Sequence, residues 1–203
     1  SSTGEATGFM PAMFTVTSAV TVTGLAVVDT GTHWNGLGQA IILLFIQVGG
    51  FGIMSITSLA GMLLTGRIGL RSRRYTQAEN RSLGTGDIAR TVFAALVITV
   101  LCEAVVALIT AARFSIEYGM TLPRALWEGL FHAVSAFNNA GFGLRSDSLV
   151  SYVGDGWIIL PLAFALIIGG LGYPVVSELY DRMRERWRRG ASASKASFPS
   201  PPK

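Results

Sequence analysis

Charged side chains are scarce in this chain of 203 residues: they make up 14% of it, whereas 50% of the residues are hydrophobic. A soluble domain usually carries about 25% charged residues. The shortage argues against a water-soluble protein and favours a membrane protein. The net charge is +4, but the basic residues gather in two clusters between apolar runs. That distribution is typical of membrane topology and does not favour nucleic-acid binding.

Cysteine and histidine are scarce as well. The single cysteine, Cys102, lies inside an apolar run and has no second cysteine for an internal disulfide. His33 and His132 have no acidic residues at metal-ligand spacing, so packing or interfacial positions are the simpler interpretation. The sequence also shows no phosphate-binding loop and no nucleophile–base pair. We therefore expect no enzyme, no cofactor and no resident metal site.

Long apolar runs are abundant. Three of them, Gly36–Gly66, Thr91–Ala112 and Gly156–Ser177, reach the length of about 20 residues that a spanning helix needs. Six arginines lie in 67–90 and five follow the third run. Because Lys and Arg favour the cytoplasmic side, these two stretches are predicted inside and the segments 1–35 and 113–155 outside.

The sequence contains an internal repeat. Phe14–Leu25 matches Phe131–Phe142 at an offset of 117, and Gln47–Leu59 matches Ile167–Leu179 at an offset of 120. Each unit is a short apolar helix, a glycine-containing turn, an outer loop and a span with a GGxG motif. Small residues allow close helix packing in membranes, which we expect at Gly49, Gly50, Gly52, Gly169, Gly170 and Gly172.

The short helices of the repeat, predicted at Pro11–Ala19 and Pro123–Phe137, are apolar although both lie on the outer side. We interpret them as re-entrant helices followed by extended return strands. Irregular backbone at membrane depth is tolerated where it is buried in protein or lines a water-filled path, and its carbonyl oxygens can replace the hydration shell of a potassium ion. The predicted filter residues are Thr21, Val22, Thr23, Gly24 and Leu25 in the first unit and Asn138, Asn139, Ala140, Gly141 and Phe142 in the second.

Glu103 is the one acidic residue in the middle of an apolar run. Ionisable residues at membrane depth are expensive and often functional. A structural hydrogen bond to an exposed helix end or a pore loop is the favoured role. The alternative is a secondary cation carrier or a membrane scaffold, in which Glu103 is a proton or packing site.

Three stretches carry a resemblance to a known family: "TSAVTVTGLAVVDTGTHW" (17–34), "GQAIILLFIQVGGFGIM" (38–54) and "LFHAVSAFNNAGFGL" (130–144). They resemble the Trk/Ktr/HKT superfamily of potassium transporters, and most of all the membrane subunit of bacterial Ktr and Trk systems. The resemblance implies an all-α membrane protein built of M1–P–M2 units around one pore. Each unit would give one filter glycine, here Gly24 and Gly141.

The resemblance also implies an organisation, in which the chain runs from the first pore loop to the second M2 helix of a longer transporter. The expected segments are 9–66 (first pore loop and M2 helix), 67–90 (cytoplasmic loop), 91–180 (second M1–P–M2 unit) and 181–203 (a basic, then disordered, cytoplasmic tail). The implied surroundings are the plasma membrane (the bacterial inner membrane), the remaining units of the transporter, a second copy in a homodimer and a cytoplasmic nucleotide-binding regulatory subunit. Potassium is the implied transported ion.

Overall fold

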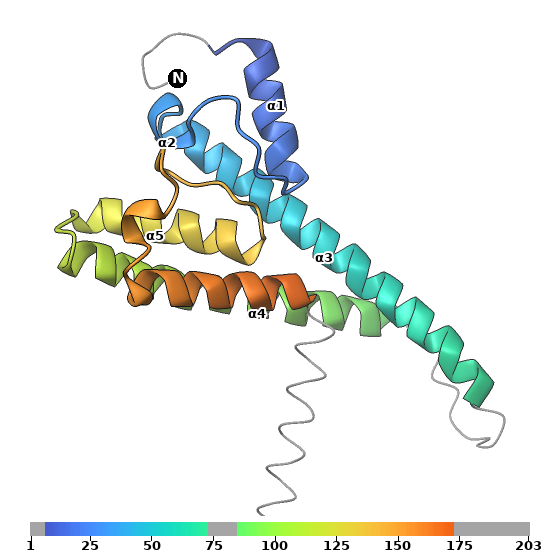
Figure 1. Ribbon diagram of the computed structural model, residues 1–203. Coiled ribbons are helices and arrows are strands. Elements are labelled where there is room, and N and C mark those ends of the chain that lie inside the picture. Colours follow the sequence, from blue (N-terminus) through green and yellow to red (C-terminus); the bar gives the residue numbers. More distant parts are fainter. Residues whose placement is uncertain (1–6, 73–84, 173–203) are drawn as a thin grey trace, which may run out of the picture.

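The computed structural model describes residues 7–72 and 85–172, and this part of the chain is helical and contains no strand (Figure 1). An all-α membrane fold is therefore confirmed. The elements in chain order are α1 (Phe9–Val20), α2 (Thr30–His33), α3 (Gly36–Ser72), α4 (Thr85–Ile116), α5 (Leu122–Phe137), the 3-10 turn η2 (Val150–Tyr152) and a final helix, Gly156–Gly172.

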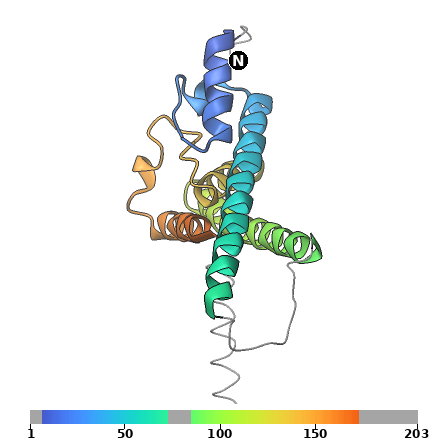
Figure 2. The same cartoon turned by 90° about the vertical axis from the view of Figure 1, so that its right-hand side faces the viewer.

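The helices form two packed groups. In the first, α1 lies against the N-terminal half of α3 (Figure 1). In the second, α4, α5 and the helix Gly156–Gly172 lie side by side, and α3 passes them obliquely (Figures 1 and 2). Both short helices, α1 and α5, end beside α3. The loops that follow them therefore start in the same region of the molecule.

Two helices contain segments long and apolar enough to cross a membrane, Gly36–Ile53 in α3 and Ala95–Ile116 in α4. Large apolar side chains on α4 stay exposed, among them Leu108 at 62%, as a lipid-facing surface requires. The third expected span is described only as far as Gly172, where it is a shorter apolar helix. Residues 173–177 and the expected tail 181–203 lie outside the described residues.

The helices on either side extend into the expected cytoplasmic loop at 67–90. Helix α3 continues to Ser72 and α4 already begins at Thr85, while residues 73–84 lie outside the described residues. The charged ends of α3 and α4 were assigned to the loop because hydropathy identifies only the apolar part of a helix. Arginine is nevertheless among the better helix formers, so a helix can continue beyond its apolar segment.

Two apolar cores hold the groups together. One lies between α4, α5 and the helix Gly156–Gly172 and includes Phe114, Phe137 and Ile158. The other joins the two repeat units, because side chains of α3 and α5 meet residues of the loop after α5. Its members are Ala19, Ile42, Ile46, Phe131, Val134, Ala140 and Phe142. Since burying one large apolar side chain contributes about 1.5–3 kcal/mol, the second core fixes the predicted filter strand of the second unit against α3.

Candidate ion-conduction site

Helix α1 ends in a tight hydrogen-bonded turn. The Thr23 N–H donates to the Ser18 carbonyl (2.9 Å) and the Val22 N–H donates to the Ala19 carbonyl (3.2 Å). This pair of bonds is a Schellman motif, in which the residue after the C-cap Thr21 takes a left-handed conformation. Val22 indeed has φ 48°, a conformation that is costly for a β-branched residue.

Helix α5 ends in the same turn, 117 residues later. The Ala140 N–H donates to the Ser135 carbonyl (2.8 Å) and the Asn139 N–H to the Ala136 carbonyl (3.0 Å), with Asn139 at φ 57°. The C-cap Asn138 has φ −79° and ψ 0°, close to the values of Thr21, −83° and 1°. The repeat seen in the sequence therefore extends to the backbone geometry of the two turns.

The turns alter one detail of the predicted filter strands. We expected extended backbone from Thr21 and from Asn138, but these residues and the ones that follow them, Val22 and Asn139, are cap residues. The irregular return segments begin at Thr23 and Ala140; we call them the first and second strands, although they form no sheet. The reason is that a helix end must satisfy its last carbonyls, and the two cap residues close that turn.

Gly24 and Gly141 lie in contact with each other. Both have left-handed backbones, with φ 78° and 73°, and a Cβ on Gly141 would lie 3.5 Å from the Gly24 Cα. A Cβ on Gly24 would lie 2.5 Å from the Ala140 carbonyl oxygen and 3.3 Å from the Gly141 Cα. Glycine is therefore required at residue 24 by both its backbone angle and the space beside it.

Most carbonyls of the two predicted strands have no hydrogen-bond donor. Within the described part of the chain, the carbonyl oxygens of 21–25 and 138–141 accept no hydrogen bond. The Phe142 carbonyl differs, because it accepts a hydrogen bond from the buried Ser135 hydroxyl at 2.6 Å. Backbone carbonyls normally find a partner. Nine carbonyls in these two segments thus have no protein donor in the described part of the chain.

The GGxG motifs place each helix end against the span of its own unit. A Cβ on Gly49 would overlap the Val20 carbonyl, and a Cβ on Gly169 would overlap the Phe137 carbonyl. Val20 and Phe137 are the last residues of α1 and α5. Close packing through these glycines therefore sets where each turn and strand begins.

The other glycines of the two motifs have different surroundings. A Cβ on Gly50 would overlap the Asn138 side chain, so this glycine packs against the second unit. Gly170 has only ordinary contacts, with Asn139 atoms at 3.7 Å, and a Cβ on Gly52 would meet nothing within 4 Å. Gly172 has φ 73° at the end of the described helix.

Glu103 has a polar partner at the end of α5. The Asn138 amide nitrogen donates to Glu103 Oε1 (3.1 Å), to Gln47 Oε1 (3.1 Å) and to the Val134 carbonyl (2.9 Å). Glu103 and Asn138 are each 6% exposed. The structure thus brings the acidic residue of the apolar run to the C-cap of α5. Gln47, the third member of this group, was not predicted from the sequence.

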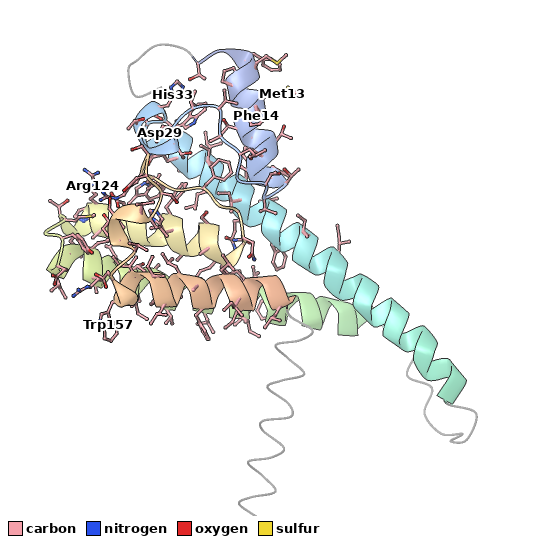
Figure 3. The ribbon with its side chains drawn as sticks, viewed as in Figure 1. Met13, Phe14, Asp29, His33, Arg124 and Trp157 are labelled. Carbon is pink, nitrogen blue, oxygen red and sulfur yellow. The ribbon has the colours of Figure 1, made fainter. Side chains whose placement is uncertain are left out.

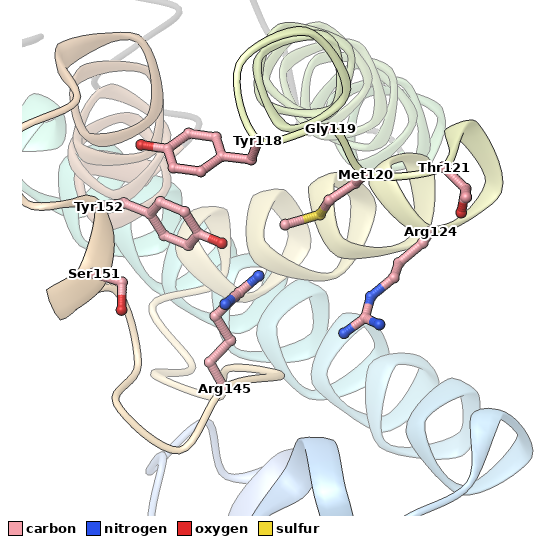
Figure 4. Close-up of a pocket in the computed structure, with 8 residues that line it drawn as sticks. All are labelled: Tyr118, Gly119, Met120, Thr121, Arg124, Arg145, Ser151 and Tyr152. Atoms are coloured by element: carbon pink, nitrogen blue, oxygen red, sulfur yellow. The ribbon is translucent and has the colours of Figure 1, made fainter.

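Charged and aromatic side chains stabilise the loop after the second strand. Arg145 follows the second strand and lies over the Tyr152 ring (4.8 Å), with its Nε 3.4 Å from Glu128 Oε2. Arg145 and Tyr152 border a cavity of about 560 Å³ that Arg124 also lines (Figure 4). Arg124 Nε donates to the other carboxylate oxygen of the buried Glu128 at 3.1 Å.

A second polar contact lies at the start of the helix Gly156–Gly172. The Arg113 Nε donates to Asp155 Oδ2 at 2.7 Å and the Tyr118 hydroxyl donates to the same oxygen at 3.2 Å. The hydrogen bond from Arg113 holds the pKa of Asp155 below its ordinary value. Trp157, two residues further on, points outward at the edge of the molecule (Figure 3).

Neither histidine belongs to a metal site in the described residues. His33 Nε2 lies 3.1 Å from the Thr7 hydroxyl, and His132 Nδ1 lies 2.8 Å from the Glu128 carbonyl. Within the described residues, no three His, Cys, Asp or Glu side chains gather where a metal ion would bind. Asp29 caps α2 by accepting the Thr32 N–H at 2.8 Å (Figure 3).

Comparison with known proteins agrees with this architecture. A family model described as TrkH, cation transport protein, matches residues 2–199. The Ktr system potassium uptake protein B of Bacillus subtilis is 42% identical over 185 residues, which cover 91% of this chain and 40% of that protein. The protein of the same name from Vibrio alginolyticus is 34% identical, covering 88% of this chain and 38% of its own length.

A third relative is the potassium/sodium uptake protein NtpJ of Enterococcus hirae, 33% identical over 91% of this chain and 41% of that protein. The chain thus spans about two fifths of the length of these relatives. The match to the family model covers nearly the whole chain. The chain therefore belongs to the TrkH family of cation transport proteins.

Proposed function

We propose that this chain takes part in potassium uptake across the plasma membrane and supplies two units of the ion-selective pore. The observation that carries the proposal is the contact of Gly24 with Gly141 at the ends of two matching turns. The names of the relatives, potassium uptake proteins in three cases, support potassium as the ion. The Enterococcus hirae relative also carries sodium in its name.

The chemistry of the proposed filter rests on the backbone. Carbonyl dipoles can replace the water around a potassium ion, and the strands offer such oxygens without a competing donor. Both α1 and α5 point their C-terminal ends at the strands (Figure 1). Because the C-terminus is the negative end of a helix dipole, two such ends stabilise a cation there without a charged side chain in the filter.

Two strands surround an ion only in part. Since the chain spans about two fifths of its relatives, we propose that further units supply the remaining carbonyls. The word "system" in the names of two relatives supports a separate partner subunit. We propose a nucleotide-binding regulatory subunit on the cytoplasmic side and a second copy of the membrane subunit. In this scheme 67–90 and the C-terminal tail face the cytoplasm.

The test replaces each glycine by serine in the full-length transporter. Gly24→Ser meets both an unfavourable φ and the Ala140 carbonyl, whereas Gly141→Ser meets mainly the unfavourable φ. Backbone strain of this kind costs about 1–3 kcal/mol, and about 1.4 kcal/mol corresponds to a factor of ten. We expect both variants to lose potassium-over-sodium selectivity by about tenfold or more, with Gly24→Ser the more severe. The measurement is rubidium uptake with competing sodium in a strain that lacks its own potassium uptake.

The matched control is Gly119→Ser. Gly119 also has a left-handed backbone, φ 63°, but a Cβ there would meet nothing within 4 Å. It lies in the outer loop between α4 and α5, away from the strands. Gly119→Ser should therefore have the same kind of backbone strain as the two filter variants and keep the ion selectivity. Unchanged selectivity in both filter variants would contradict the proposal, and so would an equal loss in Gly119→Ser.

A further inference from the structure

Three polar side chains from three helices meet beside the second strand. Gln47 comes from α3, Glu103 from α4, and Asn138 is the C-cap of α5. The Asn138 amide nitrogen is 3.1 Å from an oxygen of each of the other two. A carboxylate at this depth is expensive in a bilayer. The hydrogen bond from Asn138 to Glu103 is an interaction that an apolar residue at this position could not make.

The position of this polar cluster is specific. Asn138 stands directly before the left-handed Asn139 and two residues before the strand begins at Ala140. Its side chain also packs against Gly50 of α3. A rotation of the Asn138 amide therefore moves the residues on which the second strand is built.

The hydrogen bonds hold the amide from one side only. Its nitrogen has two hydrogens and three acceptors within reach, Gln47, Glu103 and the Val134 carbonyl. Its oxygen has no hydrogen-bond partner in the described part of the chain. Since the Val134 carbonyl belongs to α5 itself, Gln47 and Glu103 are the acceptors that tie the amide to other helices.

The first unit holds its turn in a different way. Thr21 stands at the position that corresponds to Asn138, and its hydroxyl lies 2.8 Å from the Thr17 carbonyl and 2.6 Å from the Thr23 hydroxyl. All three residues belong to the end of α1 or its turn. The first turn is therefore closed locally, whereas the second is tied to two other helices.

We propose that Glu103 and Gln47 are positioning residues, which act through Asn138 to set the second strand and so the discrimination between potassium and sodium. The inference rests on the proposed function, because it concerns the same filter. It assigns Glu103 a hydrogen-bond acceptor role and no role as an ion or proton site. The acceptor oxygen is needed and the negative charge is not.

The experiment compares four variants of the full-length transporter. Glu103→Gln keeps an acceptor oxygen and should keep selectivity, whereas Glu103→Leu removes it and should lower the potassium-over-sodium ratio by about tenfold. Asn138→Asp turns the donor into an acceptor that repels Glu103, and it should lower the ratio similarly. The double variant Asn138→Asp/Glu103→Gln restores one donor and one acceptor and should recover the ratio. Each ratio comes from the KM for rubidium and the inhibition constant for sodium, with the maximal rate normalised to the amount of transporter in the membrane.

The control is Thr110→Val on the same helix. Thr110 is fully buried, and its hydroxyl donates within α4, to the Val106 and Ala107 carbonyls. It should leave the selectivity ratio unchanged. A fall in maximal rate alone for Glu103→Leu, with the ratio kept, would show a merely structural role and overturn the inference.

Two further results are decisive. Loss of transport in Glu103→Gln equal to that in Glu103→Leu would mean that the charge itself is needed, as at an ion or proton site, and would overturn the inference. If Glu103→Leu does not reach the membrane, the double variant Asn138→Asp/Glu103→Gln tests the inference instead. A selectivity ratio no higher than that of Asn138→Asp would overturn the coupling between Glu103 and Asn138. Failure of the proposed function has a separate signature, which is unchanged selectivity in Gly24→Ser and Gly141→Ser.

Discussion

Gly49→Ala tests the contact that places the first turn. A Cβ on Gly49 would lie 2.6 Å from the Val20 carbonyl carbon and 2.8 Å from the Val20 Cα, with the carbonyl oxygen closer still. All three are backbone atoms, so no side-chain rotation relieves the overlap. The end of α1 must shift on α3, and it carries the turn at Val22 and the strand with Gly24. Overpacking of this kind costs about 1–3 kcal/mol.

The matched control lies three residues away in the same motif. A Cβ on Gly52 would meet nothing within 4 Å. Alanine is favoured over glycine inside a helix by about 1 kcal/mol, and both substitutions receive this gain. Gly52→Ala should therefore be neutral or stabilising, and the difference between the variants isolates the overlap. In the second unit Gly169→Ala should behave like Gly49→Ala, because its Cβ would overlap the Phe137 carbonyl.

The assay is denaturant unfolding of the purified full-length transporter in detergent, together with uptake under sodium competition. We expect Gly49→Ala to be less stable than Gly52→Ala by about 1–3 kcal/mol and to lose ion selectivity, because the displaced turn moves the strand. Equal stability and equal selectivity in the two variants would refute the reasoning. A loss of stability without a loss of selectivity would show that the turn does not transmit the shift to the strand.

Three further predictions follow from the contacts. Ser135→Ala removes the donor to the Phe142 carbonyl and should lower the free energy of unfolding by about 0.5–1.5 kcal/mol in the same assay. Ser18→Ala should lower it less, because the buried Ser18 hydroxyl has no partner in the described part of the chain. Equal losses in the two variants would contradict this prediction. Because the folded-state pKa of Asp155 is lowered, its stabilisation is present above its ordinary pKa of about 4 and is lost as the pH falls through the lower folded value. An unfolding series between pH 6 and pH 3, run against Asp155→Asn, should show that extra pH dependence only in the parent protein. Cysteine introduced at the exposed Ser146 in a cysteine-free background should react with a membrane-impermeant reagent added outside intact cells; absence of labelling there would reverse the predicted topology.

The sequence predicted the features that depend on short-range pattern. The repeat at an offset of 117 identified both short helices, and the observed limits, Phe9–Val20 and Leu122–Phe137, lie within two residues of the expected ones. Gly24 and Gly141 were predicted together because they occupy matching positions of the internal repeat. Their contact in the structure agrees with a common axis, while their role in the filter stays a prediction.

The sequence could not predict features that depend on tertiary contacts or on an unusual residue. Gln47 and Asn138 are 91 residues apart, and neither lies in a pattern that requires the other. Val22 was the least expected site for a left-handed cap, since glycine and asparagine normally fill it and valine resists it. The left-handed conformation of Val22 is explained by its place in the helix-ending turn, where its N–H makes the same hydrogen bond as the N–H of Asn139 does in the second unit.

The two units share a turn but differ in what holds the strand after it. The second strand is tied to α3 and α4 through Asn138 and to α5 through Ser135. The first strand lacks both ties, because Thr21 bonds within its own turn and Ser18 has no partner in the described part of the chain. Its position is limited by the packing of the end of α1 on Gly49 and by the close approach of Gly24 to the backbone of the second strand. The second strand is therefore the reference surface for the first, and we expect a disturbance at Asn138 to reach Gly24 through this close approach.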